Sequence, residues 1–224
     1  MPIIKKLLTT TAAGAAAVGA GWKFYTRDTH FVPFSPTSPS FQTWTALLRA
    51  RNPDNNPPAC IDHAVRRVAL ADLKTDDLEA LTRGFCAGVW SGLGFAYQRR
   101  FLEKKYRALP GREDHLWDKK DLGESEYKVG TKIADHFEVV ERTPGKVAVR
   151  CGDSPLNAGP RPSDGIFSME VDKDDKFATF HMKSFFFNST PEGKVAAQLP
   201  WWFELLHREY AKLWMETSVR RLLK

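Results

Sequence analysis

A histidine and a lysine stand two positions apart in the segment 177–187, which reads FATFHMKSFFF. Side chains alternate between the two faces of a β-strand, so His181 and Lys183 would share one face and Met182 would point to the other. If one face of the sheet is open to water, the pair faces solvent and has no chemical role. Aromatic residues on both faces favour a second interpretation, in which His181 and Lys183 project into an apolar cavity as catalytic donors.

The C-terminal segment 201–223 repeats its aromatic residues with helical spacing. Four residues fall at i, i+4, i+7 and i+11 and so share one stripe of a helix: Phe203, His207, Tyr210 and Trp214. A histidine on such a stripe can be an ordinary core residue with satisfied hydrogen bonds. Histidine is also the side chain best suited to exchange protons near neutral pH, and tyrosine offers a hydroxyl. We therefore predict that His207 and Tyr210 are catalytic together with the strand pair.

The same helix is richer in aromatic residues than covering a sheet requires, since leucine buries similar area and needs no partner for an indole N–H or a phenol O–H. We predict that it lines a ligand cavity whose opposite wall is the strand 177–187. The residues expected to touch a substrate are large and apolar: Trp90, Tyr97, Phe137, Met182, Phe185, Phe187, Trp202, Phe203, Leu206 and Trp214.

Sequence signatures of the common cofactor sites are absent. The chain has no P-loop, no G-x-G-x-x-G after a strand, no H-E-x-x-H, no G-x-S-x-G and no C-x-x-C. Ser91, in GVWSGLG, lies inside a helical pattern and is not expected to be a nucleophile. The three cysteines, Cys60, Cys86 and Cys151, are far apart and predict neither a disulfide nor a metal site. We expect no cofactor, although these absences leave flavin and haem open.

The segment after residue 74 has the pattern of a long helix. Thr75 or Asp76 can cap it, and its apolar residues recur every three or four positions to about residue 107. Its glycines recur at every fourth position: Gly84, Gly88 and Gly92. Each glycine costs a helix about 1 kcal/mol relative to alanine. We therefore expect protein backbone or a ligand to approach this face closely.

The remaining elements are predicted to be strands. Segment 63–70 alternates weakly, 132–142 and 146–151 form a hairpin around TPG, and 165–187 forms a second hairpin that turns at DKDD. These hairpins, followed by the helix 201–223, predict an α+β fold: an antiparallel sheet covered by a long C-terminal helix, in a helix-grip-like layout, with an additional N-terminal glycine-rich helix.

The net charge of +6 is concentrated at the N-terminus. Residues 1–27 contain four basic residues and no acidic one, which leaves 29 basic against 27 acidic residues in the remainder. No basic stripe with interleaved aromatic residues follows, so nucleic acid is not an expected partner.

Residues 1–27 form a leader with three alternative interpretations. The uncharged run is short for a spanning helix, its threonines make it weakly apolar for a secretory signal, and it is poor in arginine for a mitochondrial presequence. The alternative to all three is an N-terminal segment that either packs on the domain as a helix or is disordered. We expect three parts: the leader, an irregular proline-rich arm over 28–61, and one α+β ligand-binding domain over 62–224. An intracellular location is expected, cytoplasmic or membrane-associated through residues 1–27, with mitochondria included.

Several stretches together resemble a family of fungal proteins of unknown function, some of them associated with natural-product gene clusters. They include FCAGVWSGLGFAYQRRFLEKKY, VGTKIADHFEVVERT, SDGIFSMEV, HMKSFFFN and LPWWFELLHREYAKLWMETSVR, within residues 60–222. The last hundred residues also resemble, distantly, a small bacterial domain of unknown function. Neither resemblance brings a set of catalytic residues, and the first implies work on a specialised metabolite of filamentous fungi.

Two functions are compatible with these observations. The first is an isomerase or cyclase, such as a pericyclase, that shapes a hydrophobic small molecule without a cofactor and assists it with one or two hydrogen bonds. The second is a non-catalytic carrier of a lipid, quinone or sterol, held near a membrane by the leader. The sequence leaves the oligomeric state open.

Overall fold

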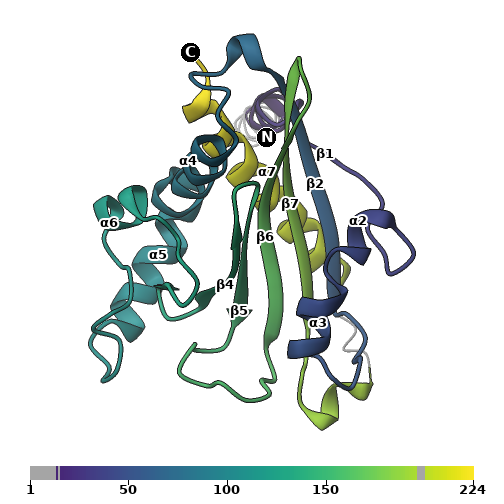
Figure 1. The fold of residues 1–224 in the computed structure, drawn as a ribbon, viewed down its shortest axis with the longest axis vertical. Helices are drawn as coiled ribbons and strands as arrows, with labels where there is room; N and C mark the ends of the chain where they lie inside the picture. The colour runs from purple at the N-terminus through teal and green to yellow at the C-terminus, as the bar shows by residue number, and fades with distance from the viewer. Residues whose placement is uncertain (1–13, 15, 196–199) are drawn as a thin grey trace, which may run out of the picture.

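The fold is built on one seven-stranded antiparallel sheet. A computed structural model describes residues 14, 16–195 and 200–224, and its strands follow the order β1-β2-β7-β6-β5-β4-β3 (Figure 1). The strands are β1 (His30–Phe31), β2 (Cys60–Ala69), β3 (Lys132–Ile133), β4 (Phe137–Thr143), β5 (Lys146–Gly152), β6 (Asp164–Lys173) and β7 (Phe177–Phe187). Both predicted hairpins and the α+β class are confirmed. Because β2 pairs with β7, strands that are far apart in the sequence lie side by side in the sheet.

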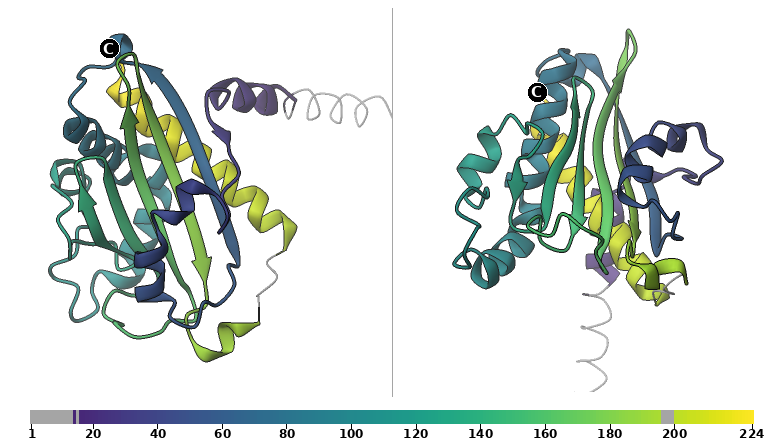
Figure 2. Two further views of the ribbon diagram at one scale, coloured as in Figure 1. Left: turned by 45° about the vertical axis from the view of Figure 1, so that its right-hand side comes forward. Right: turned by 60° about the horizontal axis from the view of Figure 1, so that its bottom comes forward.

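Helices cover both faces of this sheet. They are α2 (Pro39–Gln42), α3 (Thr45–Arg51), α4 (Leu78–Ser91), α5 (Leu93–Tyr106), α6 (Lys119–Glu124) and α7 (Trp201–Val219), with short 3-10 turns η1 (Leu70–Asp72), η2 (Pro191–Lys194) and η3 (Arg220–Leu222). Figure 2 shows α2 and α3 on one face and α4 and α7 on the other. The long C-terminal helix therefore packs on the sheet as predicted.

Alternation along β7 divides its side chains between two cores. Phe180 and Met182 are fully buried toward α4 and α7, where the ring of Phe180 meets that of Phe85 edge-on at 5.2 Å. Phe185 points to the other face and packs in a second cluster with Trp44 and Phe41 of the arm. Both faces of β7 are thus covered, and the arm 28–61 shares a core with the sheet.

The helix predicted to run unbroken from residue 76 to about 107 is two helices. Asp77, rather than Thr75 or Asp76, caps α4 by accepting a hydrogen bond from the backbone N–H of Ala80 at 2.7 Å. The chain leaves helical geometry at Gly92, where ψ is 173°, and α5 starts at the next residue. A periodicity of apolar residues continues across such a break, which is why the sequence pattern did not reveal it.

The glycines of α4 and α5 explain how α7 packs so closely. A Cβ atom on Gly88 would lie 2.6 Å from the Cα of Ser218, and one on Gly94 would lie 2.6 Å from the ring of Trp214. Such distances are far shorter than van der Waals contact. The close approach expected from the glycine spacing is therefore made by protein, the backbone and side chains of α7.

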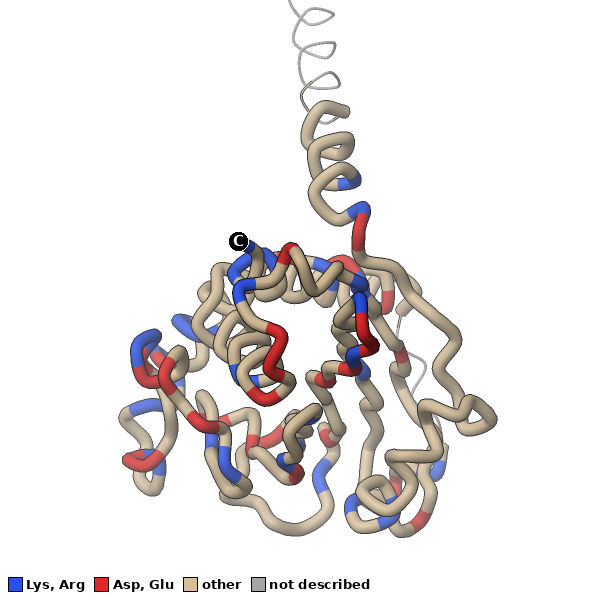
Figure 3. The backbone as a smooth tube through the Cα atoms, turned by 45° about the horizontal axis from the view of Figure 1, so that its top comes forward, with Lys and Arg blue, Asp and Glu red and all other residues tan. Residues whose placement is uncertain are grey.

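The described part of the leader includes a helix over residues 16–25 that projects from the body of the molecule (Figure 3). Its base is tied to the C-terminal segment: Trp22 donates a hydrogen bond to Glu209 of α7, and Arg220 of η3 donates one to the backbone oxygen of Tyr25 at 3.0 Å. No helix within the described ranges is long and apolar enough to cross a membrane. Residues 1–13 and 15 of the predicted leader lie outside the described residues.

Candidate functional site

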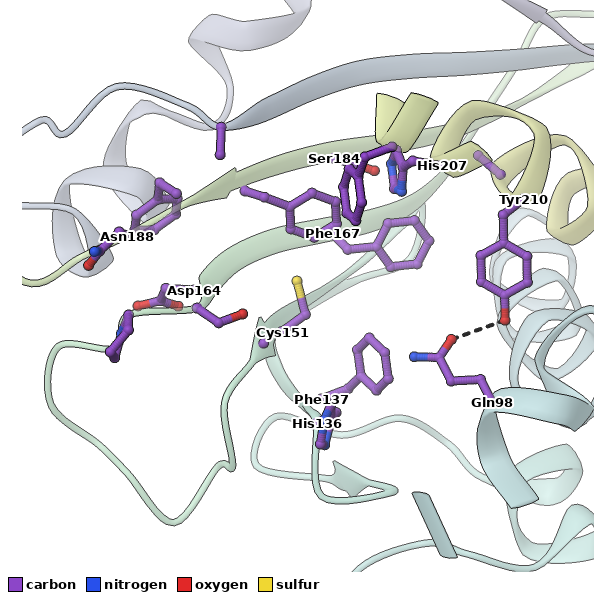
Figure 4. Close-up of a pocket in the computed structure, with 18 of the residues that line it drawn as sticks. Gln98, His136, Phe137, Cys151, Asp164, Phe167, Ser184, Asn188, His207 and Tyr210 are labelled. Carbon is purple, nitrogen blue, oxygen red and sulfur yellow. Dashed lines mark hydrogen bonds between the residues drawn. The ribbon is translucent and has the colours of Figure 1, made fainter. Parts of the chain in front are cut away.

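A cavity of about 460 Å³ lies between α7 and the sheet (Figure 4). The sheet supplies Phe137, Cys151, Phe167, Ser184 and Phe186 to its wall, while α7 supplies Phe203, His207, Tyr210, Ala211 and Trp214. Carbon atoms dominate this lining, and only a few polar groups reach it. The volume is in the range of sites for small molecules, about 300–1,000 Å³.

Tyr210 and Gln98 form the polar group at one end of the cavity. The Tyr210 hydroxyl donates a hydrogen bond to Oε1 of Gln98 at 3.0 Å. Burial raises the pKa of Tyr210 to about 12, so the phenol remains protonated at neutral pH. Because Oε1 is the acceptor, the amide nitrogen of Gln98 is free to donate, and it points into the cavity (Figure 4).

His207 lies on the same helix, one turn before Tyr210, and is held by a carboxylate of β2. Its Nε2 is 2.7 Å from Oδ2 of Asp62, whose side chain is only 2% exposed. The ring also meets Phe186 of β7 edge-on, at 5.1 Å between centroids. These contacts fix the imidazole beside the cavity wall.

Cys60 joins this pair. Cys60 and Asp62 are two positions apart on β2, so both side chains point to the face of the sheet that α7 covers. The ligand atoms of Cys60, Asp62 and His207 all lie within 4.8 Å of one another. The pKa of the Cys60 thiol is raised to about 12, chiefly by burial and in addition by the nearby Asp62 carboxylate.

A buried charge network shapes the other end of the cavity. Arg150 donates two hydrogen bonds to the carboxylate of Asp164, at 2.8 and 2.6 Å, and Ser189 donates a third at 2.6 Å. Arg150 also binds the backbone oxygens of Ala158 and Gly159. Since these groups satisfy one another, we assign them to holding the loop 153–163 rather than to chemistry.

The predicted catalytic residues fall on opposite faces of the sheet. His207 and Tyr210 line the cavity. His181 and Lys183 point to the face covered by the arm, so the expectation that all four share one cavity is not met. Nδ1 of His181 is 2.9 Å from Nε2 of His63, and Lys183 forms an ion pair with Glu170. The orientation follows from strand alternation, because Ser184 and Phe186 take the cavity face.

The predicted substrate-binding residues also divide. Four of them line the cavity: Phe137, Phe187, Phe203 and Trp214. Trp90 and Met182 are fully buried in the main core, and Phe185 belongs to the second core. Tyr97, Trp202 and Leu206 are exposed to solvent by 86%, 50% and 61%. Helical spacing identifies residues that share one side of a helix, but it does not tell how far the buried surface extends around that helix. The sequence therefore does not separate these three exposed residues from the lining ones.

Sequence reasoning missed Gln98, Cys60 and Asp62. The spacing Cys60-x-Asp62 puts a thiol and a carboxylate on one strand face, but their partner His207 is 145 positions beyond Asp62. Only the pairing of β2 with β7 and the packing of α7 bring them together.

Comparison with protein families, curated proteins and solved structures finds no match. Function is therefore inferred from the site itself.

Proposed function

We propose that this protein binds a hydrophobic small molecule between α7 and the sheet and isomerises or cyclises it. The observation that carries this proposal is the apolar cavity of about 460 Å³ whose polar groups lie in two pairs: Gln98 is hydrogen-bonded to Tyr210, and Nε2 of His207 is 2.7 Å from Oδ2 of Asp62. A pocket of this kind orients a ligand through a few polar contacts and holds its shape through apolar ones.

Shape and one directed hydrogen bond account for the proposed reaction. Aromatic walls such as Phe167 and Trp214 can hold a flexible substrate in a folded, reactive form, which lowers the entropic part of the barrier. The amide of Gln98 donates to a substrate carbonyl as negative charge develops on its oxygen. Tyr210 acts through Gln98, because its hydroxyl fixes which way the amide points.

The resemblance to fungal proteins of natural-product gene clusters supports a specialised metabolite as the substrate. Such a molecule would carry an extended apolar skeleton and at least one carbonyl. Isomerisation of a molecule with these two features requires no redox cofactor.

The test compares cell extracts with and without the protein. Extract from cells that lack this chain should accumulate its substrate, and adding the purified full chain should convert one compound into another of equal mass but different chromatographic retention. Tyr210→Phe should slow this conversion about tenfold or more, because loss of the hydrogen bond that orients Gln98 raises the barrier by about 1.4 kcal/mol.

Tyr97→Phe is the matched control, since Tyr97 is 86% exposed on α5 and should leave the rate unchanged. Absence of any conversion would contradict the enzymatic proposal. A compound that instead co-purifies unchanged, and moves between vesicles when the chain is added, would identify a carrier. The exposed apolar residues at the start of α7 favour this second candidate, because they could contact a membrane: Trp201, Trp202, Leu205 and Leu206.

A further inference from the structure

The cluster of Cys60, Asp62 and His207 contains a buried carboxylate that its protein neighbours do not satisfy. The side chain of Asp62 is 2% exposed, and neither of its oxygens accepts an aligned hydrogen bond from any residue in the described ranges. The 2.7 Å contact to Nε2 of His207 is close, yet that nitrogen also lacks an aligned partner. Buried carboxylates normally have several such bonds or a bound cation.

The three side chains are also a chemically consistent set of metal ligands. Zinc binds cysteine sulfur at about 2.3 Å, histidine nitrogen at about 2.0–2.1 Å and carboxylate oxygen at about 2.0–2.2 Å, so ligand atoms around a tetrahedral ion stand roughly 3.3–3.7 Å apart. Here the three atoms lie within 4.8 Å of one another. Nε2 of His207 and Oδ2 of Asp62, now 2.7 Å apart, would have to separate slightly to admit the ion between them.

We propose that Cys60, Asp62 and His207 bind a divalent zinc ion at the wall of the cavity. A thiolate and a carboxylate together carry two negative charges, which the ion neutralises, so the complex adds no net charge to the protein interior. The thiol proton of Cys60 is released to solvent when the ion binds. A soft thiolate beside an imidazole favours zinc over magnesium or calcium, which prefer oxygen ligands.

The position of His207 gives this site a consequence for the cavity. His207 lines the cavity, and Ser184, another lining residue, pairs with Asp62 across β2 and β7. Three protein ligands leave the fourth position of a tetrahedral ion to water or to a bound molecule, as in catalytic rather than structural zinc sites. A substrate oxygen could therefore reach the ion. The zinc site does not depend on the proposed isomerase function, and the two can be tested separately.

The experiment measures metal binding by the full chain after treatment with a chelator and a phosphine reductant. Titration calorimetry with zinc chloride should give one ion per chain. Cobalt(II) in place of zinc should give a thiolate-to-cobalt charge-transfer band, which reports a sulfur ligand directly. Cys60→Ser should abolish the band and weaken zinc binding at least tenfold, whereas Cys86→Ala, which removes another buried thiol, should change neither.

Absence of stoichiometric zinc binding, or a charge-transfer band that survives Cys60→Ser, would overturn the inference. If Cys60→Ser does not fold by circular dichroism, His207→Gln decides, because the side chain of His207 is 17% exposed and tolerates replacement better. Unchanged zinc affinity in folded His207→Gln would also overturn the site. A chain that binds no zinc but converts its substrate would refute this inference alone and leave the proposed function standing.

Discussion

Buried charges in this protein differ in how completely they are paired. Glu216, which is fully buried, accepts hydrogen bonds from Thr29 at 2.6 Å, Arg66 at 2.7 Å and Arg220 at 3.1 Å. It therefore joins the segment before β1, strand β2 and the end of α7. Asp62, on the same strand as Arg66, has no aligned hydrogen-bond donor among the described residues and makes a close contact with His207. A buried charge whose hydrogen bonds are all made, such as Glu216, stabilises the fold. A buried charge that lacks hydrogen bonds, such as Asp62, indicates a binding site.

His63, on the arm side of β2, provides a prediction about pH. The pKa of His63 is lowered to about 3, chiefly by burial and in addition by the neighbouring His181. In the unfolded chain the pKa is about 6.5. Below pH 6.5 the unfolded chain binds a proton that the folded protein does not, so the free energy of unfolding should fall by up to about 1.4 kcal/mol per pH unit down to about pH 3. Urea unfolding at pH 7, 6 and 5 measures this slope.

His63→Gln should reduce the dependence of the free energy of unfolding on pH below 6.5. The expected reduction is up to about 1.4 kcal/mol per pH unit, which corresponds to the uptake of one proton. Burial also lowers the pKa values of His115 and His136, so these residues contribute with the same sign and part of the slope should remain. His30→Gln, at an exposed position, is the control and should keep the full slope. Equal slopes for His63→Gln and the unmodified protein would show that His63 takes up its proton equally well in the folded state.

At the scale of elements, the contacts of α7 with α4 and α5 depend on glycines, which have no side chain. Gly88 is buried where the backbone of Ser218 crosses it, and Gly94 accommodates the ring of Trp214. Trp214 is also one wall of the cavity. The glycines therefore let α7, which carries this wall residue, pack closely on α4 and α5.

Gly88→Ala tests this contact. The added methyl group would stand 2.6 Å from the Cα of Ser218, and backbone cannot move aside as a flexible side chain can. The gain in helix propensity, about 1 kcal/mol, opposes an overpacking cost of roughly 1–3 kcal/mol, and we expect net destabilisation in thermal or urea unfolding. Gly21→Ala, whose methyl group would meet nothing within 4 Å, should be neutral or slightly stabilising. Equal stability of the two variants would contradict the close contact.

The sequence predicted elements better than it predicted their contacts. The period of two in 165–187 and the helical period in 201–223 are local properties. Both strands formed where they were expected, and the helix formed over Trp201–Val219, where it gives way to the 3-10 turn η3. The sequence did not decide which face of β7 meets the cavity, because aromatic residues occur on both faces. In the structure both faces are buried, each in its own core cluster. The contact of Asp62 with His207 joins residues far apart in sequence, so no local pattern could indicate it.

At the scale of the whole molecule, the sheet separates two sets of ionisable residues. On one face the arm covers His63, His181 and Lys183, and on the other α7 covers the cavity. Trp44 anchors the arm: its side chain is fully buried, and its Nε1 donates a hydrogen bond to Glu170 at 3.1 Å. The helices of the arm, α2 and α3, should therefore contribute to stability without taking part in the cavity, since none of their residues lines it.

Trp44→Ala tests this separation. Removing a buried tryptophan typically costs 3–5 kcal/mol, so the midpoint of urea unfolding should fall strongly. Trp201→Ala, at a position 78% exposed, should change the free energy of unfolding by less than about 0.5 kcal/mol. Under conditions where Trp44→Ala remains folded, its zinc affinity should match that of the unmodified chain within about twofold, because additivity holds for distant sites. A loss of zinc affinity in folded Trp44→Ala would show that the two faces are coupled through the sheet, and an unchanged unfolding midpoint would show that the arm is only loosely attached.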